Sequence, residues 1–230
     1  MTSDMTSPST ASTWADARTW QDTAQSWDER YTETAQRWSG SVNPTLPSLV
    51  APLPPGRALD VGCGEGADAV WLAEHGWDVS ALDISAVAVE RGRARCSNAA
   101  ITWLVGDLAA LPDLGNFNHG RVEVGRFDLV SLQYPAIPRG PQDSTVDVLL
   151  DLVAPGGWLL VVGHHLPAVE ARGGLPAGLD PAAYVLPSVV AARLDEQWEV
   201  VVDEVRERAV APDHPGASVP DVVLMARRRE

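Results

Sequence analysis

Short apolar runs alternate with helical patterns along most of the chain. Five runs rich in Val, Leu, Ile and Ala predict strands, at residues 58–61, 77–82, 101–105, 127–132 and 158–162. Three intervening segments of helix-forming residues predict helices, over 67–75, 86–96 and 144–154. This alternation, with strands that are apolar on both faces, is typical of an α/β protein whose parallel sheet is covered by helices on both sides.

The last part of the chain follows a different pattern. A helix is expected over residues 181–194, with Pro187 marking a break or a second start. Two strands, at 198–205 and 221–227, follow with only a loop between them. A connection of this kind favours an antiparallel final pair of strands. NAD-binding domains, in contrast, more often continue with another parallel βαβ unit.

The N-terminal region divides into a tail and an aromatic segment. Residues 1–13 are rich in Ser and Thr and carry few apolar side chains, which predicts a disordered tail. From residue 14 onward, apolar side chains recur at intervals of four, three, four and seven, which predicts one face of a helix; they are Trp20, Ala24, Trp27, Tyr31 and Trp38. We therefore expect an N-terminal helical segment at 14–55 and the main domain at 56–230.

The stretch from residue 57 to 85 carries the clearest chemical signal. Gly62, Gly64 and Gly66 follow the first strand on alternate positions, where missing side chains permit unusual backbone angles and the close approach of a ligand. Asp83 ends the second strand, where a carboxylate can accept both hydroxyls of a ribose. These features predict a nucleoside cofactor, and the loose pattern Gly-x-Gly-x-x-Ala that ends at Ala67 leaves NAD or FAD open.

Asp60 favours a different cofactor. It stands inside an otherwise apolar strand, where a carboxylate is costly to bury unless it meets a positive or donor-rich partner. The ammonium group of a cofactor that carries an amino acid is such a partner.

These residues also carry a resemblance to a known family. The sequence D-V-G-C-G-E-G from Asp60 to Gly66, with Asp83 after it, resembles motif I and the acidic motif of class I S-adenosylmethionine (SAM)-dependent methyltransferases. The segments 105–107, 127–130 and 152–157 are similar to later motifs of that family in the same order. The resemblance implies a Rossmann-like, seven-stranded and mostly parallel sheet of order 3-2-1-4-5-7-6, whose last strand is antiparallel.

The resemblance also implies roles at the cofactor. Asp60 faces the ammonium group, Asp83 holds the ribose, and Asp107 accepts from the adenine amino group, with a helix N-cap as the alternative role of Asp107. The other residues expected to bind SAM are Gly62, Cys63, Gly64, Gly66, Ile84, Gly106, Leu108 and Gln133. Tyr31 and Trp38 either only pack on the domain or also form a lid over cofactor and substrate, as N-terminal helices do in this family.

Three residues at strand exits are candidates for catalysis. Tyr134 follows the fourth strand, and His164 and His165 follow the fifth, at the edge where ligands bind in open α/β sheets. A histidine here can act on the substrate as a general base or hydrogen-bond donor, can form a hydrogen bond that only stabilises the fold, or can bind a metal. Successive strand residues face opposite sides, so we expect only one histidine to reach the pocket. No metal is expected, because third and fourth ligands are not evident.

Composition restricts the partners. Thirty-one acidic against seventeen basic residues give a formal charge of −14, which repels nucleic acids and anionic membranes. Cys63 and Cys96 lack metal-ligand spacing, the N-terminus lacks a signal-peptide pattern, and no apolar run approaches the roughly 20 residues of a membrane helix. We expect a cytoplasmic monomer or homodimer that acts on a small molecule.

The class of methyl acceptor is indicated only by a resemblance to one branch of the methyltransferase family. The motif region, with the preceding W-D-x-R-Y and W-S-G segments, resembles the tellurite-resistance and thiopurine methyltransferase-like branch, which implies a thiol or other soft nucleophile, with oxygen and nitrogen acceptors possible. The alternatives are a SAM-binding module without catalysis and an NAD(P)-dependent oxidoreductase.

Overall fold

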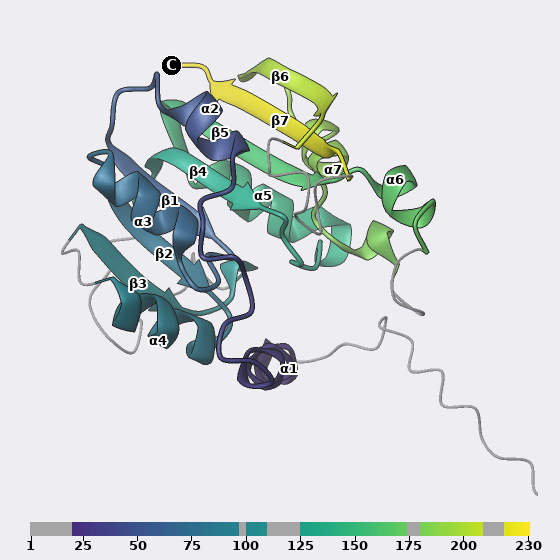
Figure 1. The fold of residues 1–230 in the computed structure, drawn as a ribbon. Coiled ribbons are helices and arrows are strands. Elements are labelled where there is room, and N and C mark those ends of the chain that lie inside the picture. The colour runs from purple at the N-terminus through teal and green to yellow at the C-terminus, as the bar shows by residue number, and fades with distance from the viewer. Residues whose placement is uncertain (1–19, 97–99, 110–124, 174–179, 209–218) are drawn as a thin grey trace, which may run out of the picture.

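The computed structural model describes residues 20–96, 100–109, 125–173, 180–208 and 219–230 (Figure 1). Within these ranges the strands form a seven-stranded sheet of order β3-β2-β1-β4-β5-β7-β6. The strands are β1 (Arg57–Val61), β2 (Asp78–Asp83), β3 (Ile101–Val105), β4 (Phe127–Gln133), β5 (Val153–His164), β6 (Trp198–Arg206) and β7 (Asp221–Arg228). Neighbours among β1 to β5 are parallel, and β7 is antiparallel to both β5 and β6. The predicted fold class and strand order are confirmed.

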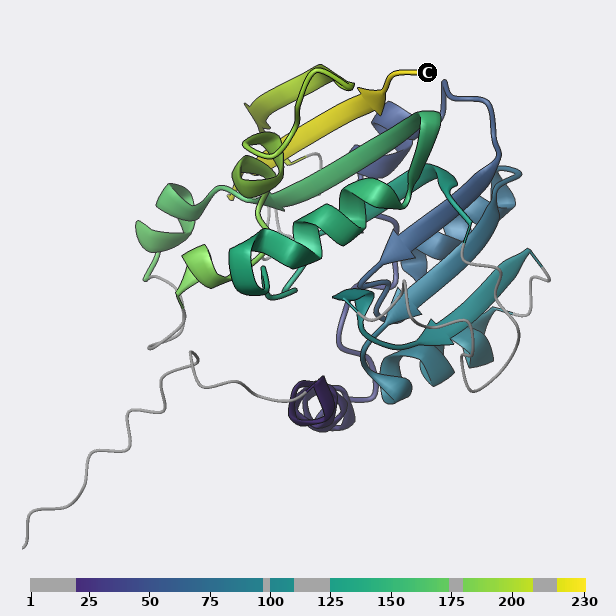
Figure 2. The same ribbon diagram turned by 180° about the vertical axis from the view of Figure 1, so that it is seen from behind.

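Helices cover both faces of this sheet (Figures 1 and 2). The helices are α1 (Trp20–Thr32), α2 (Thr45–Val50), α3 (Ala67–Glu74), α4 (Ala86–Arg95), α5 (Ser144–Asp151), α6 (Leu166–Glu170) and α7 (Pro187–Ala191), with 3₁₀ turns at Pro141–Asp143 and Pro181–Ala183. Helices α2, α3 and α4 pack on one face, α5 and α7 pack on the other, and α1 contacts α4.

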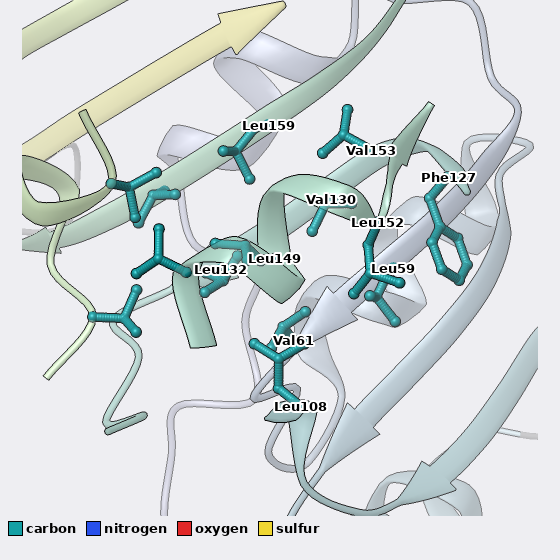
Figure 3. Close-up of a cluster of buried hydrophobic side chains, with 14 of the residues drawn as sticks. Leu59, Val61, Leu108, Phe127, Val130, Leu132, Leu149, Leu152, Val153 and Leu159 are labelled. Atoms are coloured by element: carbon teal, nitrogen blue, oxygen red, sulfur yellow. The ribbon is translucent and has the colours of Figure 1, made fainter. Parts of the chain in front are cut away.

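Two apolar cores result from the alternation of side chains along the strands. Leu59 and Val61 point from β1 into the core beneath α5, together with Val130 and Leu149 (Figure 3). Ala58 points the other way, toward α2 and α3. Asp60 shares the orientation of Ala58, so its carboxylate lies on the α3 side of the sheet, where the glycine turn also leads.

The aromatic helix is shorter than predicted. Helix α1 ends at Thr32, so Trp38 does not lie on it and the predicted single helical face is wrong at that position. The reason is a long-range contact, since the carboxylate of Glu65 accepts the backbone N–H groups of Arg37 and Trp38. These two N–H groups therefore donate to a side chain of the glycine turn, and not to carbonyl groups of a preceding helical turn.

Other boundaries also differ from the predictions. The helix expected over 144–154 ends at Asp151, because Val153 already pairs with Phe127 in the sheet. The turn expected at 155–157 lies inside β5, at a shift of register where Gly156 has φ +76°. The helix expected over 181–194 consists of a 3₁₀ turn and α7, which begins at Pro187. Helices α2 and α6 were not predicted.

Some predictions lie outside the described residues. They are the tail at 1–13, the start of the aromatic segment at 14–19, and most of the loop at 209–220.

Candidate functional site

The glycine turn between β1 and α3 takes backbone conformations that favour glycine. Gly62, Gly64 and Gly66 have φ of +71°, +54° and +83°. A Cβ atom on Gly66 would lie 2.2 Å from the Trp103 ring, so this glycine is required by packing. A Cβ atom on Gly62 would meet nothing within 4 Å. The turn therefore borders open space at Gly62, where a ligand can approach the backbone.

Asp83 lies beside this turn at the end of β2. Its Oδ2 accepts the backbone N–H of Gly64 at 2.8 Å, and its Oδ1 accepts that of Ser85 at 2.8 Å. Burial raises the pKa of the Asp83 carboxyl, while these two hydrogen bonds oppose the rise. Each oxygen keeps a second lone pair, so the carboxylate is fixed in place and can still accept two hydroxyl groups.

Asp60 is the buried acid that points from β1 toward the same region. It is 2% exposed, and its Oδ2 has no hydrogen-bond partner within the described part of the chain. Burial raises its pKa, and the charges of Asp68 and Asp83 raise it further, while the backbone N–H of Ala69 acts in the opposite direction. A buried carboxylate oxygen without a partner is costly, so the site suits a cationic or donor group.

Cys63 contributes its backbone to the turn. Its N–H donates to the carbonyl of Leu82 at 3.0 Å, and its thiol lies 3.7 Å from the carbonyl oxygen of Gly64. Burial, followed by the negative charges of Asp83 and Asp60, raises the pKa of this thiol. The side chain therefore stays a neutral thiol, which is not a nucleophile.

The residues after β3 reach Asp83 through the backbone. The N–H of Gly106 donates to the carbonyl of Asp83 at 2.9 Å. Asp107 is half-buried, and its Oδ1 accepts the N–H of Ala109 at 3.0 Å, as a helix N-cap does. Leu108 is buried in the core under α5, and Ile84 is half-buried. Gly106 thus bonds to the backbone of Asp83, while a backbone hydrogen bond from Ile84 helps to lower the pKa of the Asp83 carboxyl.

Tyr31 and Trp38 lie over the glycine turn, although only Tyr31 is on α1. The indole Nε1 of Trp38 donates to the Tyr31 hydroxyl at 2.9 Å. A Cβ atom on Gly64 would lie 2.9 Å from that hydroxyl and 3.4 Å from the Trp38 ring. Tyr31 is 3% exposed and Trp38 is 51% exposed, so the pair covers the turn and borders solvent.

Three acids that the sequence did not single out tie the N-terminal segment to the site. The Oδ1 of Asp28, on α1, accepts the Ser85 hydroxyl at 2.6 Å and the Val87 N–H at 3.1 Å. Asp68, on α3, accepts the backbone and side-chain N–H groups of Asn43 at 2.7 and 2.6 Å.

The third of these acids is Glu65, in the glycine turn. Besides its bonds to the backbone at residues 37 and 38, it pairs with Arg91 at 3.2 Å. Both Asp28 and Glu65 fall in motifs quoted above, but nothing in the sequence pattern indicated their partners.

At the exit of β4, Gln133 and Tyr134 turn toward β5. The Gln133 amide donates to the Ser131 hydroxyl at 3.1 Å, and its Oε1 is buried with no partner among the described residues. Tyr134 has φ +52°, its hydroxyl donates to Oδ2 of Asp221 at 2.9 Å, and its ring stacks on the His164 ring at a centroid distance of 4.6 Å.

Asp221 and Arg208 complete this cluster and were missed from the sequence. Asp221 is fully buried at the start of β7, and its Oδ1 accepts Nε and Nη2 of Arg208 at 3.0 and 2.7 Å. The same Nη2 lies 2.8 Å from Nδ1 of His164. The cluster joins residues far apart in sequence, which is why spacing did not reveal it.

The two neighbouring histidines differ in their surroundings. His164 is exposed at the end of β5, and its pKa is lowered by desolvation and by Arg208, with Asp221 acting against them. His165 caps α6, donates its backbone N–H to the carbonyl of Pro220 at 3.0 Å, and has a buried Nδ1 without a partner in the described ranges. Only His164 belongs to the cluster around Tyr134.

The described ranges hold neither a cluster of metal-ligating side chains nor a helix that could cross a bilayer. No group of three or more His, Cys, Asp and Glu side chains there could hold a metal ion. Among the described helices, none has the length and apolar character that a bilayer crossing needs.

Comparisons with known proteins agree with this geometry. Residues 58–157 match the family described as a methyltransferase domain. The chain is similar to a ribosomal RNA small subunit methyltransferase C of Alcanivorax borkumensis, with 36% identity over 124 residues, which cover 50% of this chain and 35% of that protein. The chain thus spans about a third of that relative's length.

A second relative is covered more completely. The chain is similar to a probable thiol methyltransferase 2 of Arabidopsis thaliana, with 38% identity over 169 residues, 69% of each protein. Among solved structures, the N-methyltransferase NodS of Bradyrhizobium japonicum, in complex with S-adenosylhomocysteine, shares the fold with a TM-score of 0.64 and 19% identity, over 90% of this chain and 99% of NodS.

Proposed function

We propose that this chain, which belongs to the class I SAM-dependent methyltransferases, transfers a methyl group from SAM to a small-molecule nucleophile, with thiols and other soft nucleophiles favoured. The observation that carries the proposal is the pair of buried carboxylates beside the glycine turn. Asp60 has an oxygen without a partner among the described residues, which it can offer to a cation. Asp83 is held by two backbone N–H groups and can still accept hydroxyl groups.

The residues of the site fit SAM in three ways. The Asp60 carboxylate would hold the ammonium group of the methionine moiety, since a charge-assisted hydrogen bond offsets its burial. The Asp83 carboxylate would accept the two ribose hydroxyls. The open space at Gly62 would admit the methionine moiety close to the backbone. We assign the adenine end to Gly106, Asp107 and Leu108, with Ile84 beside the ribose.

Bound SAM supplies an electrophilic methyl group on a sulfonium sulfur. The chain contributes by positioning a nucleophile in line with that methyl group and by excluding water from it. Tyr134, His164 and His165, at the exits of β4 and β5, are the residues we assign to the acceptor side, and we assign Gln133 to the reactive end of SAM. Tyr31 and Trp38, over the glycine turn, are assigned to covering the site.

Two observations support a small and soft acceptor. The formal charge of −14 disfavours long-range attraction of RNA or DNA, although one relative is named as a ribosomal RNA methyltransferase. The Arabidopsis relative is named as a probable thiol methyltransferase.

Three predictions from the sequence stay predictions. They are the cytoplasmic location, the monomeric or dimeric state, and the domain division at residue 56.

The proposal is tested with SAM that carries a labelled methyl group. The purified chain is incubated with a panel that holds a small thiol, a phenol, a primary amine, iodide and a ribosomal RNA fragment, and the products are separated and identified by mass. We expect a labelled thioether with an equal amount of S-adenosylhomocysteine, and no product with the variant Asp83→Ala. Label only in the RNA would contradict the small-molecule acceptor. Tight SAM binding without transfer to any acceptor would indicate a SAM-binding module.

A further inference from the structure

The hydrogen bond between Arg208 and His164 fixes which ring nitrogen of His164 carries the proton. The distance between Nη2 of Arg208 and Nδ1 of His164 is 2.8 Å. A guanidinium group has only donors, so Nδ1 must accept this bond and cannot carry a proton while the bond persists. The neutral ring then has its proton on Nε2, and Nε2–H is a donor.

Arg208 is itself held so that this bond persists. Its Nε and Nη2 both donate to Oδ1 of the fully buried Asp221, and its guanidinium carbon lies 4.5 Å from the centre of the Tyr134 ring. Oδ2 of the same aspartate accepts the Tyr134 hydroxyl and lies 3.5 Å from that of Thr45. Rotation of Arg208 away from His164 would leave a buried carboxylate short of donors.

The stack with Tyr134 fixes the plane of the imidazole ring. The two ring centroids are 4.6 Å apart with an interplanar angle of 28°. Tyr134 in turn is fixed at its hydroxyl by Asp221 and at its backbone N–H, which donates to the carbonyl of Val162 at 2.7 Å. His164 is thus oriented by Tyr134, which follows β4, and by Arg208, which follows β6, and both of these are held by Asp221 on β7. His164 itself is exposed at the edge of the sheet.

We infer that His164 serves the methyl acceptor as a neutral hydrogen-bond donor through Nε2–H and not as a general base, and that Arg208 and Asp221 are positioning residues that maintain this state. The inference rests on the proposed function and narrows its substrate class to acceptors that react without their proton, a thiolate foremost.

The electron balance of thiolate methylation requires no base. A lone pair of the thiolate sulfur forms the new S–C bond, and the electron pair of the breaking C–S bond stays on the sulfur of the leaving S-adenosylhomocysteine. No proton moves in this step, so a donor that stabilises the bound anion is sufficient. A thiol has an ordinary pKa of about 8.5, within reach of neutral pH once a donor favours its anion.

The cluster does not supply a proton acceptor for other substrates. The Tyr134 hydroxyl donates a hydrogen bond to Asp221 and keeps its proton. Burial, together with the negative charge of Asp221, raises the pKa of Tyr134. Asp221 accepts four bonds or contacts already, from Arg208, Tyr134 and Thr45. An alcohol or an ammonium group would have to lose its proton elsewhere before it could react.

The first test observes the ring directly, in the full chain without SAM or acceptor. Nitrogen-15 NMR of labelled histidine, with the His164 signals assigned from the spectrum of His164→Gln, reports the protonation of both ring nitrogens. We expect a neutral ring with the proton on Nε2 at pH 7 to 8 in wild type. We expect a mixture of tautomers in Arg208→Met, which keeps an unbranched side chain but has no donor. A ring protonated on Nδ1, or one that titrates near neutral pH, would overturn the inference.

The second test separates a donor from a base by the size of the loss. His164→Phe keeps a stacked ring without a donor, and His164→Gln keeps an N–H donor without a base. We expect kcat/KM for a small thiol to fall about 10-fold in His164→Phe, as for one lost hydrogen bond, and to stay within about 3-fold in His164→Gln. A general base would instead lose about 10²- to 10⁴-fold in both variants. SAM affinity serves as the folding control and is expected to be unchanged in both.

The outcomes distinguish a failure of the proposed function from a failure of the donor role of His164. If wild type methylates no acceptor, the proposed function fails and the acceptor role of His164 fails with it, whereas the NMR spectrum still decides the tautomer. If a thiol is methylated but His164→Gln loses as much activity as His164→Phe, the proposed function stands and the donor role is wrong.

Discussion

Replacement of Asp60 by Asn is expected to weaken SAM binding while stabilising the ligand-free protein. The carboxylate is 2% exposed, and its Oδ2 has no partner within the described ranges. Without a ligand, it is buried near the negative charges of Asp68 and Asp83, which raise its pKa. An amide of the same shape removes the charge and its repulsion from both neighbours, so the variant is expected to unfold at a higher temperature than wild type at pH 8.

The loss of affinity follows from the same geometry. A hydrogen bond to a charged group contributes about 1.5–3 kcal/mol, which corresponds to a roughly 10- to 150-fold weaker Kd for SAM. Calorimetric titration measures the affinity, and differential scanning calorimetry without ligand measures the stability. The matched control is Asp78→Asn, because Asp78 is exposed at the opposite end of β2 and is expected to change neither quantity. An Asp60→Asn variant that binds SAM as tightly as wild type would refute the placement of the ammonium group.

The raised pKa of Asp60 also gives the sign of two pH effects. A carboxyl whose pKa is higher in the folded than in the unfolded protein binds a proton more readily when folded, so wild-type stability decreases as pH rises from about 4 through the folded pKa. The stability gained by Asp60→Asn should therefore grow with pH. A cationic ligand favours the ionised carboxylate, so SAM affinity should rise with pH up to the raised pKa of the ligand-free Asp60, with protons released to the buffer below that pKa. Proton release is measured by titration in buffers of different ionisation enthalpy, and its absence would contradict the assignment.

Three further outcomes are expected. Asp83→Ala removes the acceptor of the predicted ribose contact and two backbone hydrogen bonds, so calorimetry should detect no SAM binding, and retained affinity would make the ribose placement wrong. Gly66→Ala introduces a Cβ atom 2.2 Å from Trp103 at φ +83°, so thermal unfolding should show a loss of about 2 kcal/mol or more, and an unchanged Tm would contradict this packing. Asp28→Ala removes the bonds of α1 to Ser85, so hydrogen exchange in α1 should accelerate while exchange in β1 stays the same, and equal exchange in α1 would show that the contact contributes nothing.

The sheet could be predicted because its signals are local. Apolar runs bounded by glycines set the first three strands to within a residue, and two helix ends follow equally local rules. Ser85 caps α4 by accepting the N–H of Ala88 at 3.1 Å, and Gly76 ends α3 with φ +90°. The strand order came from the resemblance to the methyltransferase family and not from the pattern of residues.

Contacts between distant residues could not be predicted in the same way. The aromatic spacing continued to Trp38, but Glu65 binds the backbone there, so the helix ends earlier. Asp221 and Arg208 looked like ordinary charges near strand ends, because the partner His164 is 44 positions from Arg208 in sequence. Local pattern locates the elements, and only the assembled sheet edge shows which polar groups meet.

Calorimetric titration of the purified chain with SAM, S-adenosylhomocysteine, NAD and NADP in parallel decides which cofactor the glycine turn and its two carboxylates bind. We predict micromolar binding of SAM and S-adenosylhomocysteine, loss of both in Asp83→Ala, and no binding of either nicotinamide nucleotide. Binding of NAD or NADP in place of SAM would contradict the assignment of Asp60 and, with it, the proposed methyl transfer.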